Sequence, residues 1–252
     1  MDLFAESMNA APRTNQLTER YRPTSWEQVV GQDATVQRIR NLAKRGLAGR
    51  AYWLSGPSGA GKTTIGRLLA ADVASEWDTD EVDGTTLTVA ALKDMERTLA
   101  LHGMGGKGRA IIVNEAHGLR ADVIRFLLVA LERIPSHACW VFTTTDAGQL
   151  SLFDGIDADP LLSRCVRLPL AKDTCEPYSE RARTVAVTEG IDGQPLDDYR
   201  LLYRECKGNL RAMLQRVEVG DIPRAAVKAA PTTPRFANGL ELKRYLEAGG
   251  KL

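Results

Sequence analysis

The chain has 252 residues, of which 44% are hydrophobic and 26% charged, and its formal net charge is +1. The length fits one large domain, or one large and one small domain, and the balanced charge excludes a uniformly basic protein. No apolar run approaches the roughly 18 residues that a membrane span requires, so we expect no membrane partner.

The N-terminus and the cysteines indicate the compartment. Residues 1–16 are predicted to be a flexible leader, and they lack the basic and then apolar pattern of a secretion signal. The four cysteines form no C-x-x-C pair, which argues against zinc and against a disulfide framework. Cys139 and Cys165 lie in apolar runs and are expected to be buried thiols. These features predict a cytoplasmic protein.

Apolar runs that alternate with helical patterns predict an α/β domain over residues 17–170. The predicted strands are residues 51–55, 86–90, 110–113, 138–143 and 165–170. Residues 123–134 form an apolar stripe of helical period that Pro135 ends. Continuous apolar strands alternating with helices are typical of a parallel sheet that helices cover on both faces.

The strands stop after residue 170. Three helical patterns, at 176–189, 195–206 and 209–219, predict a small all-helical domain over residues 171–219. Residues 220–252 accumulate Pro, Gly and Ala and are predicted to be a linker and C-terminal tail that ends in a short helix.

Charge is uneven between residues 34 and 83. Residues 34–71 hold seven basic residues and no acidic one, and residues 72–83 hold six acidic residues and no basic one. One interpretation is a basic helix followed by an acidic loop, both in solvent. The other is a phosphate-rich partner near the basic segment.

The segment GPSGAGKT, residues 56–63, has the full G-x-x-x-x-G-K-[ST] pattern between a predicted strand and a predicted helix. Its glycines allow backbone N–H groups to cradle phosphate oxygens, and the helix N-terminus adds its positive end. Lys62 can reach the outer phosphates, and the Thr63 hydroxyl can ligate magnesium. The pattern predicts nucleotide binding but by itself does not establish hydrolysis.

Further motifs stand around this loop in a fixed order: LTERYRPTSWEQVVGQ (17–32), NEAHGL (114–119), TTTD (143–146), LLSRC (161–165) and GNLR (208–211). In this order and spacing the sequence resembles the AAA+ ATPase subunits of replication clamp loaders, of the bacterial motor-subunit or small loader-subunit type. The resemblance is strong over 17–170 and fair over 171–219. It implies a P-loop AAA+ parallel-sheet sandwich with a small all-helical lid domain.

The resemblance also implies residue roles in binding ATP. The adenine side of the pocket would be lined by Thr18, Glu19, Arg20, Tyr21 and Val30. The phosphates would be held by Gly59, Ala60, Gly61, Lys62, Thr63 and Thr64.

Four further roles concern hydrolysis. Glu115 would be the general base, and Thr145 the first sensor of the γ-phosphate. Arg164 would be an arginine finger that reaches the ATP of a neighbouring subunit, and Arg211 a second sensor on the ATP of its own subunit. Phosphoryl transfer requires charge neutralisation more than covalent chemistry, so lysine, magnesium and arginine suffice for it.

Taken singly, these residues have simpler interpretations. Arg164 could be a solvated loop residue, and residues 143–145 the end of a β-rich strand. His117 fits a packing residue at a helix start better than a catalyst, because Glu115 already fills the role of base. Only the ordered set favours the functional reading.

The sequence departs from the family in four places. It has no zinc knuckle after the first helix, and only roughly 30 residues follow the lid, too few for the helical collar domain of clamp loaders. An insertion, residues 150–160, lengthens the loop before Ser163. Asn114 stands where the family has an aspartate.

Asn114 affects the metal in particular. Its carbonyl oxygen can accept one hydrogen bond from magnesium-bound water, so it would act on the metal through water, but it lacks the charge of a carboxylate. We therefore expect a weak ATPase with an elevated magnesium requirement. On sequence grounds, Asn114→Asp should lower that requirement and raise turnover.

The favoured function is an oligomeric clamp-loader ATPase that uses ATP and Mg²⁺ to grip a sliding clamp and primer-template DNA in replication. Arg120 and Arg125 could contact the DNA backbone, or simply form an exposed helix face. The subunits could assemble as a homo- or hetero-oligomer. One alternative is a nucleotide-gated scaffold subunit with little turnover, which Asn114 favours. The other is an AAA+ remodeller of recombination or of a mobile element.

Overall fold

The computed structural model describes residues 16–103, 107–145, 159–171, 174–191 and 193–225. Five parallel strands form one sheet in the order β2-β3-β4-β1-β5. The strands are β1 (Arg50–Gly56), β2 (Ala74–Asp83), β3 (Gly108–Asn114), β4 (Ala138–Thr145) and β5 (Cys165–Pro169). The predicted parallel sheet is therefore confirmed.

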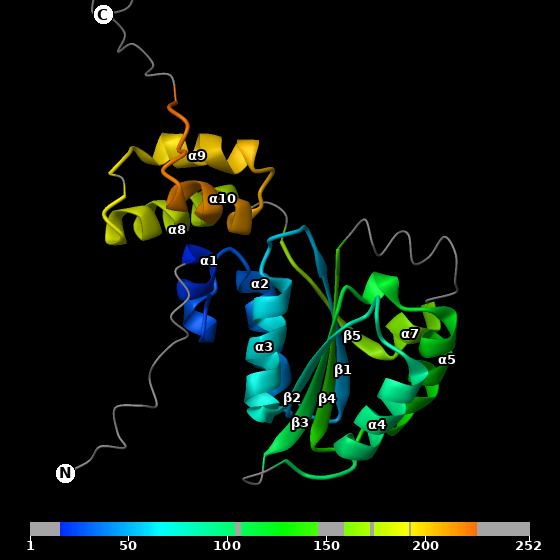
Figure 1. The fold of residues 1–252 in the computed structure, drawn as a ribbon. Coiled ribbons are helices and arrows are strands. Elements are labelled where there is room, and N and C mark those ends of the chain that lie inside the picture. The colour runs from blue at the N-terminus through cyan, green and yellow to red at the C-terminus, as the bar shows by residue number, and fades with distance from the viewer. Residues whose placement is uncertain (1–15, 104–106, 146–158, 172–173, 192, 226–252) are drawn as a thin grey trace, which may run out of the picture.

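Helices cover both faces of the sheet (Figure 1). On one face lie α2 (Asp33–Ala43) and α3 (Lys62–Val73), and their apolar residues share a core with Tyr52, Leu54 and Val141. On the other face lie α4 (Val89–Leu99), α5 (Ala121–Ala130) and α7 (Asp159–Ser163). Trp53, Trp140 and Phe142 fill the core on that side.

The strands predicted at 51–55, 110–113, 138–143 and 165–170 are present with small shifts in their ends, but the one predicted at residues 86–90 is wrong. That segment leads into α4, because the Thr88 side chain accepts a hydrogen bond from the Ala91 amide (3.2 Å) and caps the helix. A helix N-cap explains the threonine there.

The acidic segment that we interpreted as a solvated loop is instead the edge strand β2. Among the described strands it pairs with β3 alone, and Ala74 and Asp78 are its buried members. Acidic residues are rare in strands, which hid this element from the sequence pattern. At an edge they remain in solvent and discourage pairing with another chain.

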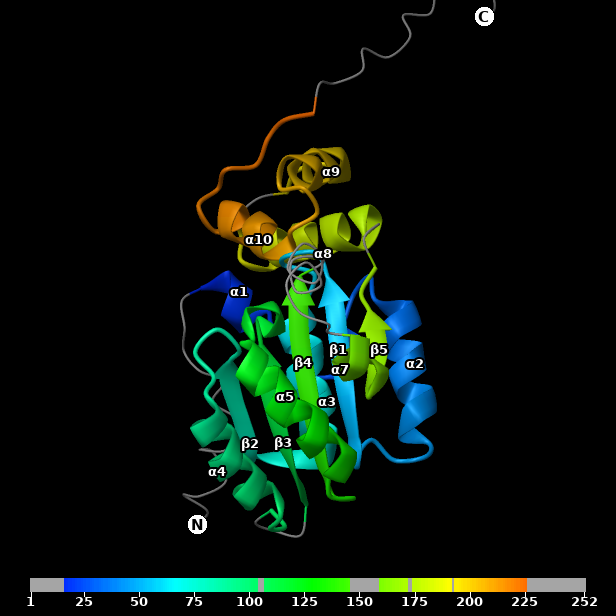
Figure 2. The same ribbon diagram turned by 90° about the vertical axis from the view of Figure 1, so that its right-hand side faces the viewer.

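Above the sheet lies the lid, formed by α8 (Cys175–Thr188), α9 (Leu196–Glu205) and α10 (Leu210–Glu218). Tyr178, Tyr199, Leu202 and Met213 form a core of its own. The lid covers the carboxyl ends of the strands (Figure 2). In an open parallel sheet this is the edge where ligands bind.

The short helix α1 (Leu17–Arg20) packs into the lid core, not into the sheet. Leu17 is 3% exposed, and its amide donates to the Glu218 carboxylate at the end of α10 (3.4 Å). Residues 17–30 therefore connect the two parts of the molecule, which the proposed boundary at residue 17 did not anticipate. The short 3-10 helix η2 (Trp26–Gln28) follows in the same connection.

Two further 3-10 helices flank α5: η3 (Ala116–Gly118) precedes it and η4 (Leu131–Arg133) follows it. Cys139 is buried as predicted, while Cys165 is partly exposed. Within the described residues, no helix is long and apolar enough to cross a membrane. The leader 1–15, most of the insertion 150–160 and the tail from 226 lie outside the described residues.

Candidate nucleotide site

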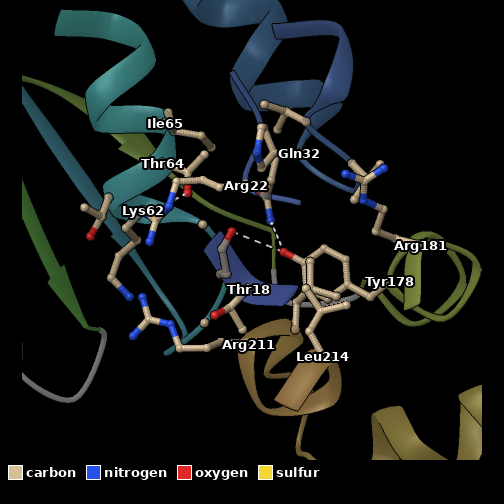
Figure 3. Close-up of a pocket in the computed structure, with 18 of the residues that line it drawn as sticks. Thr18, Arg22, Gln32, Lys62, Thr64, Ile65, Tyr178, Arg181, Arg211 and Leu214 are labelled. Carbon is tan, nitrogen blue, oxygen red and sulfur yellow. Dashed lines mark hydrogen bonds between the residues drawn. The ribbon is translucent and has the colours of Figure 1, made fainter. Parts of the chain in front are cut away.

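A cleft that is open to solvent lies between the carboxyl ends of the strands and the lid. The phosphate loop, the segment after α1, the end of β4 and helices α8 and α10 all contribute to its walls (Figure 3). Sequence-predicted residues in its lining are Thr18, Tyr21, Val30, Gly59, Ala60, Gly61, Lys62, Thr63, Thr64, Glu115, Thr145 and Arg211.

The phosphate loop adopts a conformation that requires glycine at two positions. Gly59 has φ +72° and Gly61 has φ +93°, both in the left-handed region that side chains disfavour. Lys62 begins α3, is 8% exposed, and donates to the carbonyl oxygens of Gly56 (3.0 Å) and Pro57 (2.8 Å). The lysine is thus folded over its own loop, beside the N-terminus of α3.

Thr63 and Asn114 meet at the end of β3. The Thr63 hydroxyl donates to Asn114 Oδ1 (3.2 Å), and the Thr143 hydroxyl donates to the same oxygen (2.9 Å). Asn114 Nδ2 donates to a carboxylate oxygen of Glu81 (2.7 Å). The sequence pointed to Thr63 and Asn114, but nothing in it indicated Glu81.

Glu115, the residue after Asn114, has a strained backbone conformation. Its φ is +50°, uncommon for any residue with a side chain, and such strain concentrates at functional positions. Its carboxylate is 46% exposed and lies 3.3 Å from His117 Nδ1. Glu115 and Thr145 both line the cleft, so a carboxylate and a hydroxyl face the same space as Lys62.

The lid brings two arginines to the cleft, Arg181 from α8 and Arg211 from α10, and Arg211 projects towards the same space as Lys62 (Figure 3). Arg181 donates to the carbonyl of Tyr21 (3.1 Å) and stacks over its ring at 5.8 Å. Arg22 completes the basic lining and donates to the Thr64 hydroxyl (3.4 Å). The sequence reasoning missed Arg22 and Arg181, because each stands outside the quoted motif positions to which a role was assigned.

A buried tyrosine joins the lid to the loop. Tyr178 is 2% exposed; its hydroxyl donates to the Ala60 carbonyl (3.2 Å) and accepts from Gln32 Nε2 (3.2 Å). Burial raises the pKa of Tyr178, so the hydroxyl keeps its proton and remains a donor.

Two residues assigned to the adenine side do not line the cleft. Glu19 pairs with Arg22, and that hydrogen bond lowers the pKa of its carboxyl. Arg20 points to the lid and pairs with Glu189 (2.7 Å). Consecutive side chains of a helix point in different directions, so only some residues of the segment 18–21 can face one ligand.

Arg164 lies outside the cleft. Its guanidinium donates to Glu132 (Nε to Oε1, 3.1 Å) and to the Pro160 carbonyl (2.8 Å). Arg120 precedes α5 and lies 3.6 Å from Asp122, and Arg125 is exposed on that helix.

The residues present fit a nucleotide with its metal. Left-handed glycines at a helix N-terminus, together with a lysine, form a cradle for phosphates. The Thr63 hydroxyl beside an amide oxygen offers the oxygen ligands and water acceptors that a hard divalent cation requires. Lys62, Glu115, Thr145 and Arg211 surround one space.

The parallel sheet, the phosphate loop and the lid define an α/β P-loop protein with the AAA+ fold. The RuvB Holliday junction branch migration motor of Thermotoga maritima superimposes with a TM-score of 0.61 at 20% identity, over 79% of this chain and 64% of that one. At that identity the likeness shows the fold alone. No protein-family model matches the chain.

Sequence relatives are clamp-loader subunits. DNA polymerase III subunit tau of Escherichia coli K12 is 27% identical over 265 residues, covering 93% of this chain and 40% of tau. Replication factor C small subunit of Haloarcula marismortui is 26% identical over 244 residues, covering 92% of this chain and 71% of that protein. The predicted resemblance to the clamp-loader family is confirmed, although the chain spans less than half the length of tau.

Proposed function

We propose that this protein is an ATP-hydrolysing AAA+ subunit of a clamp-loader complex acting on DNA in replication. The observation that carries the proposal is the convergence of Lys62, Glu115, Thr145 and Arg211 on one cleft. The relatives, which are clamp-loader subunits, support the same function. Oligomerisation, a sliding clamp and the backbone of primer-template DNA are parts of this proposal.

The places of the residues support the following roles. Lys62 releases the carbonyls of Gly56 and Pro57 to meet the outer phosphates, since a charged partner is preferred to neutral ones. Mg²⁺ supplies charge neutralisation between the phosphates when bound. The Thr63 hydroxyl would ligate it, and Asn114 would accept a hydrogen bond from its water.

Glu115 would take the proton of the attacking water. Its exposed carboxylate leaves room for a water molecule, and His117 beside it limits its orientation. Thr145 and Arg211 would contact the terminal phosphate from the strand end and from the lid. Arg211 stands at a helix N-terminus, where a cation is disfavoured unless an anion lies before it.

Arg164 would act on a neighbouring subunit. It does not line the cleft of its own chain, and its present partner Glu132 is on the surface with a side chain 59% exposed. Exposed ion pairs contribute at most about 1 kcal/mol, so a phosphate of another subunit can displace Glu132.

The test is complementation between two inactive variants. Arg164→Ala should bind ATP yet lose turnover by on the order of 10³-fold, and Glu115→Gln should bind ATP without hydrolysing it. Mixing the two proteins with primed DNA and clamp restores interfaces that pair an intact base with an intact arginine, so activity should recover. Absence of recovery would place Arg164 in cis or outside the reaction.

A scaffold subunit that binds nucleotide without turnover is the second candidate. Asn114 favours it, because a neutral amide replaces a carboxylate beside the metal position. Steady-state ATPase of the assembled wild-type protein at saturating Mg²⁺ separates the two candidates. Nucleotide binding with no hydrolysis would establish the scaffold.

A further inference from the structure

Asn114 is held by hydrogen bonds on both sides of its amide. Oδ1 accepts from Thr63 (3.2 Å) and Thr143 (2.9 Å), and Nδ2 donates to Glu81 Oε1 (2.7 Å). These contacts join α3, β4 and the edge strand β2 at the end of β3. A side chain that merely filled space at this position would not need partners from three elements.

Glu81 decides which way the amide faces. A carboxylate can only accept hydrogen bonds, so it takes the NH₂ group of Asn114 and turns the carbonyl oxygen to the opposite side. Hydroxyls can donate or accept, so Thr63 and Thr143 would tolerate either orientation. Without Glu81 the amide would be free to rotate, and its NH₂ group could then point at Thr63 and repel a cation there.

Glu81 has a second partner besides Asn114. Arg67 of α3 donates to both of its oxygens, Nε to Oε2 (2.8 Å) and Nη2 to Oε1 (3.2 Å). The two strands are in register, with Glu81 opposite Ile112 and Asp83 opposite Asn114. The Glu81 side chain is 29% exposed, and its hydrogen bond to Asn114 lies near the surface.

We propose that Glu81 is a positioning residue of the magnesium site: its carboxylate holds Asn114 Nδ2, so that Oδ1 stays beside the Thr63 hydroxyl and faces the metal. This inference rests on the proposed function, since it assumes a magnesium nucleotide in the cleft. The acidic edge strand β2, which supplies Glu81, would then contribute to the metal site although it lies outside the phosphate loop.

The proposal reverses the expectation drawn from the sequence for Asn114→Asp. An aspartate there would set a second carboxylate about as close to Glu81 as Nδ2 now lies, at 2.7 Å. Like charges at such a distance repel strongly. The substitution should therefore be unfavourable alone, and favourable only when Glu81 is changed to an amide that can donate to the new carboxylate.

The first experiment measures binding of a non-hydrolysable ATP analogue as Mg²⁺ is raised, so that turnover has no influence. Glu81→Ala should raise the half-saturating Mg²⁺ concentration by about five- to ten-fold, as expected for a lost hydrogen bond of ordinary strength. Arg67→Ala is the matched control, because it breaks the ion pair but leaves Glu81 on Asn114; it should change the value less than about two-fold. Equal effects of both would mean a structural ion pair and would overturn the proposal.

The second experiment compares Asn114→Asp, Glu81→Gln and the double variant Glu81→Gln/Asn114→Asp, by urea unfolding of the nucleotide-free protein and by the same Mg²⁺ titration. Asn114→Asp should unfold at lower urea, and the double variant should recover and hold Mg²⁺ more tightly than either single variant. Strictly additive effects would show that the two side chains do not interact.

The outcomes separate the inference from the proposed function. Nucleotide binding that depends on Mg²⁺ in the wild type but is indifferent to Glu81 overturns the inference alone. Binding of the analogue that ignores Mg²⁺ in the wild type overturns both.

Discussion

The two walls of the cleft are built differently. On the sheet side, Thr63 and Asn114 are fixed by neighbouring parallel strands and by α3, all of which share continuous cores with the sheet. On the lid side, Arg211 belongs to three helices with a core of their own, and α1 packs into that same core. The first wall cannot shift without disturbing the sheet, whereas the second can shift as a unit.

Few contacts hold the lid on the loop. The Tyr178 hydroxyl donates to the Ala60 carbonyl, and Asn209 lies against Gly59. Small interfaces between parts with separate cores permit relative motion. We therefore expect the sheet wall to fix the positions of the phosphates and the metal, and the lid wall to close over them. Substitutions on the sheet wall should weaken ATP binding more than substitutions on the lid wall.

The largest effect is expected on the sheet side, from Lys62→Ala. Loss of the cation that faces the outer phosphates should weaken ATP binding on the order of 100-fold, in line with hydrogen bonds to charged groups. Lys93→Ala, at an exposed position of α4, is the control and should leave affinity unchanged. A titration with a fluorescent ATP analogue measures both, and unchanged affinity of Lys62→Ala would refute the phosphate cradle.

Gly59→Ala should break the contact between loop and lid. An alanine Cβ would lie 1.8 Å from Asn209 Oδ1, which caps α10 by accepting from the Ala212 amide (3.1 Å). The cap must then break, which costs about 1 kcal/mol, in addition to about 1–2 kcal/mol for a left-handed alanine.

Gly61→Ala is the matched control for Gly59→Ala. It has the same left-handed strain at φ +93°, but an added Cβ meets nothing within 4 Å. Urea unfolding of the nucleotide-free protein should show Gly59→Ala less stable than Gly61→Ala by about 1 kcal/mol. Equal stabilities would mean that the lid does not rest on the loop.

Arg211→Ala tests the lid wall and should have a smaller effect than Lys62→Ala. Arg211 is exposed and is carried by the movable part, so its loss should weaken ATP binding about ten-fold, near the lower limit for a charged hydrogen bond. Arg204→Ala, on the exposed side of α9, controls for the charge of the lid. If Arg211→Ala equalled Lys62→Ala in the same titration, the two walls would not differ as described.

The smallest effect is expected from Tyr178→Phe. Removing one buried hydroxyl should lower the free energy of unfolding by about 1 kcal/mol. Tyr52→Phe removes a comparable bond, from the Tyr52 hydroxyl to the Leu47 carbonyl (2.6 Å), inside the sheet domain and away from the cleft. Both variants should lose similar stability in urea, but only Tyr178→Phe should alter ATP affinity, by about two-fold; a change in both would contradict the special position of Tyr178 between lid and loop.

The sequence predicted the parallel sheet, the three lid helices and most residues around the phosphate loop, because these features depend on local patterns. A strand of buried apolar residues and a glycine-rich loop before a helix are visible in any window of the chain. The prediction failed at residues 74–90. The segment expected to be an acidic loop is the edge strand β2, and the segment expected to be a strand leads into the capped helix α4. Edge strands need only one buried face and one partner, so their composition resembles that of a loop.

Local sequence thus determined the phosphate loop, the fold class and the presence of Asn114 after a buried strand. Tertiary structure decided which distant side chains meet these residues: Glu81 on the amide, Arg22 and Arg181 in the cleft, and Arg164 outside it on Glu132. The reason is that strand order and lid packing bring together residues far apart in sequence, as Glu81 and Asn114 are across neighbouring strands. A hydrogen bond requires a particular distance and direction, and no periodicity in the chain encodes these.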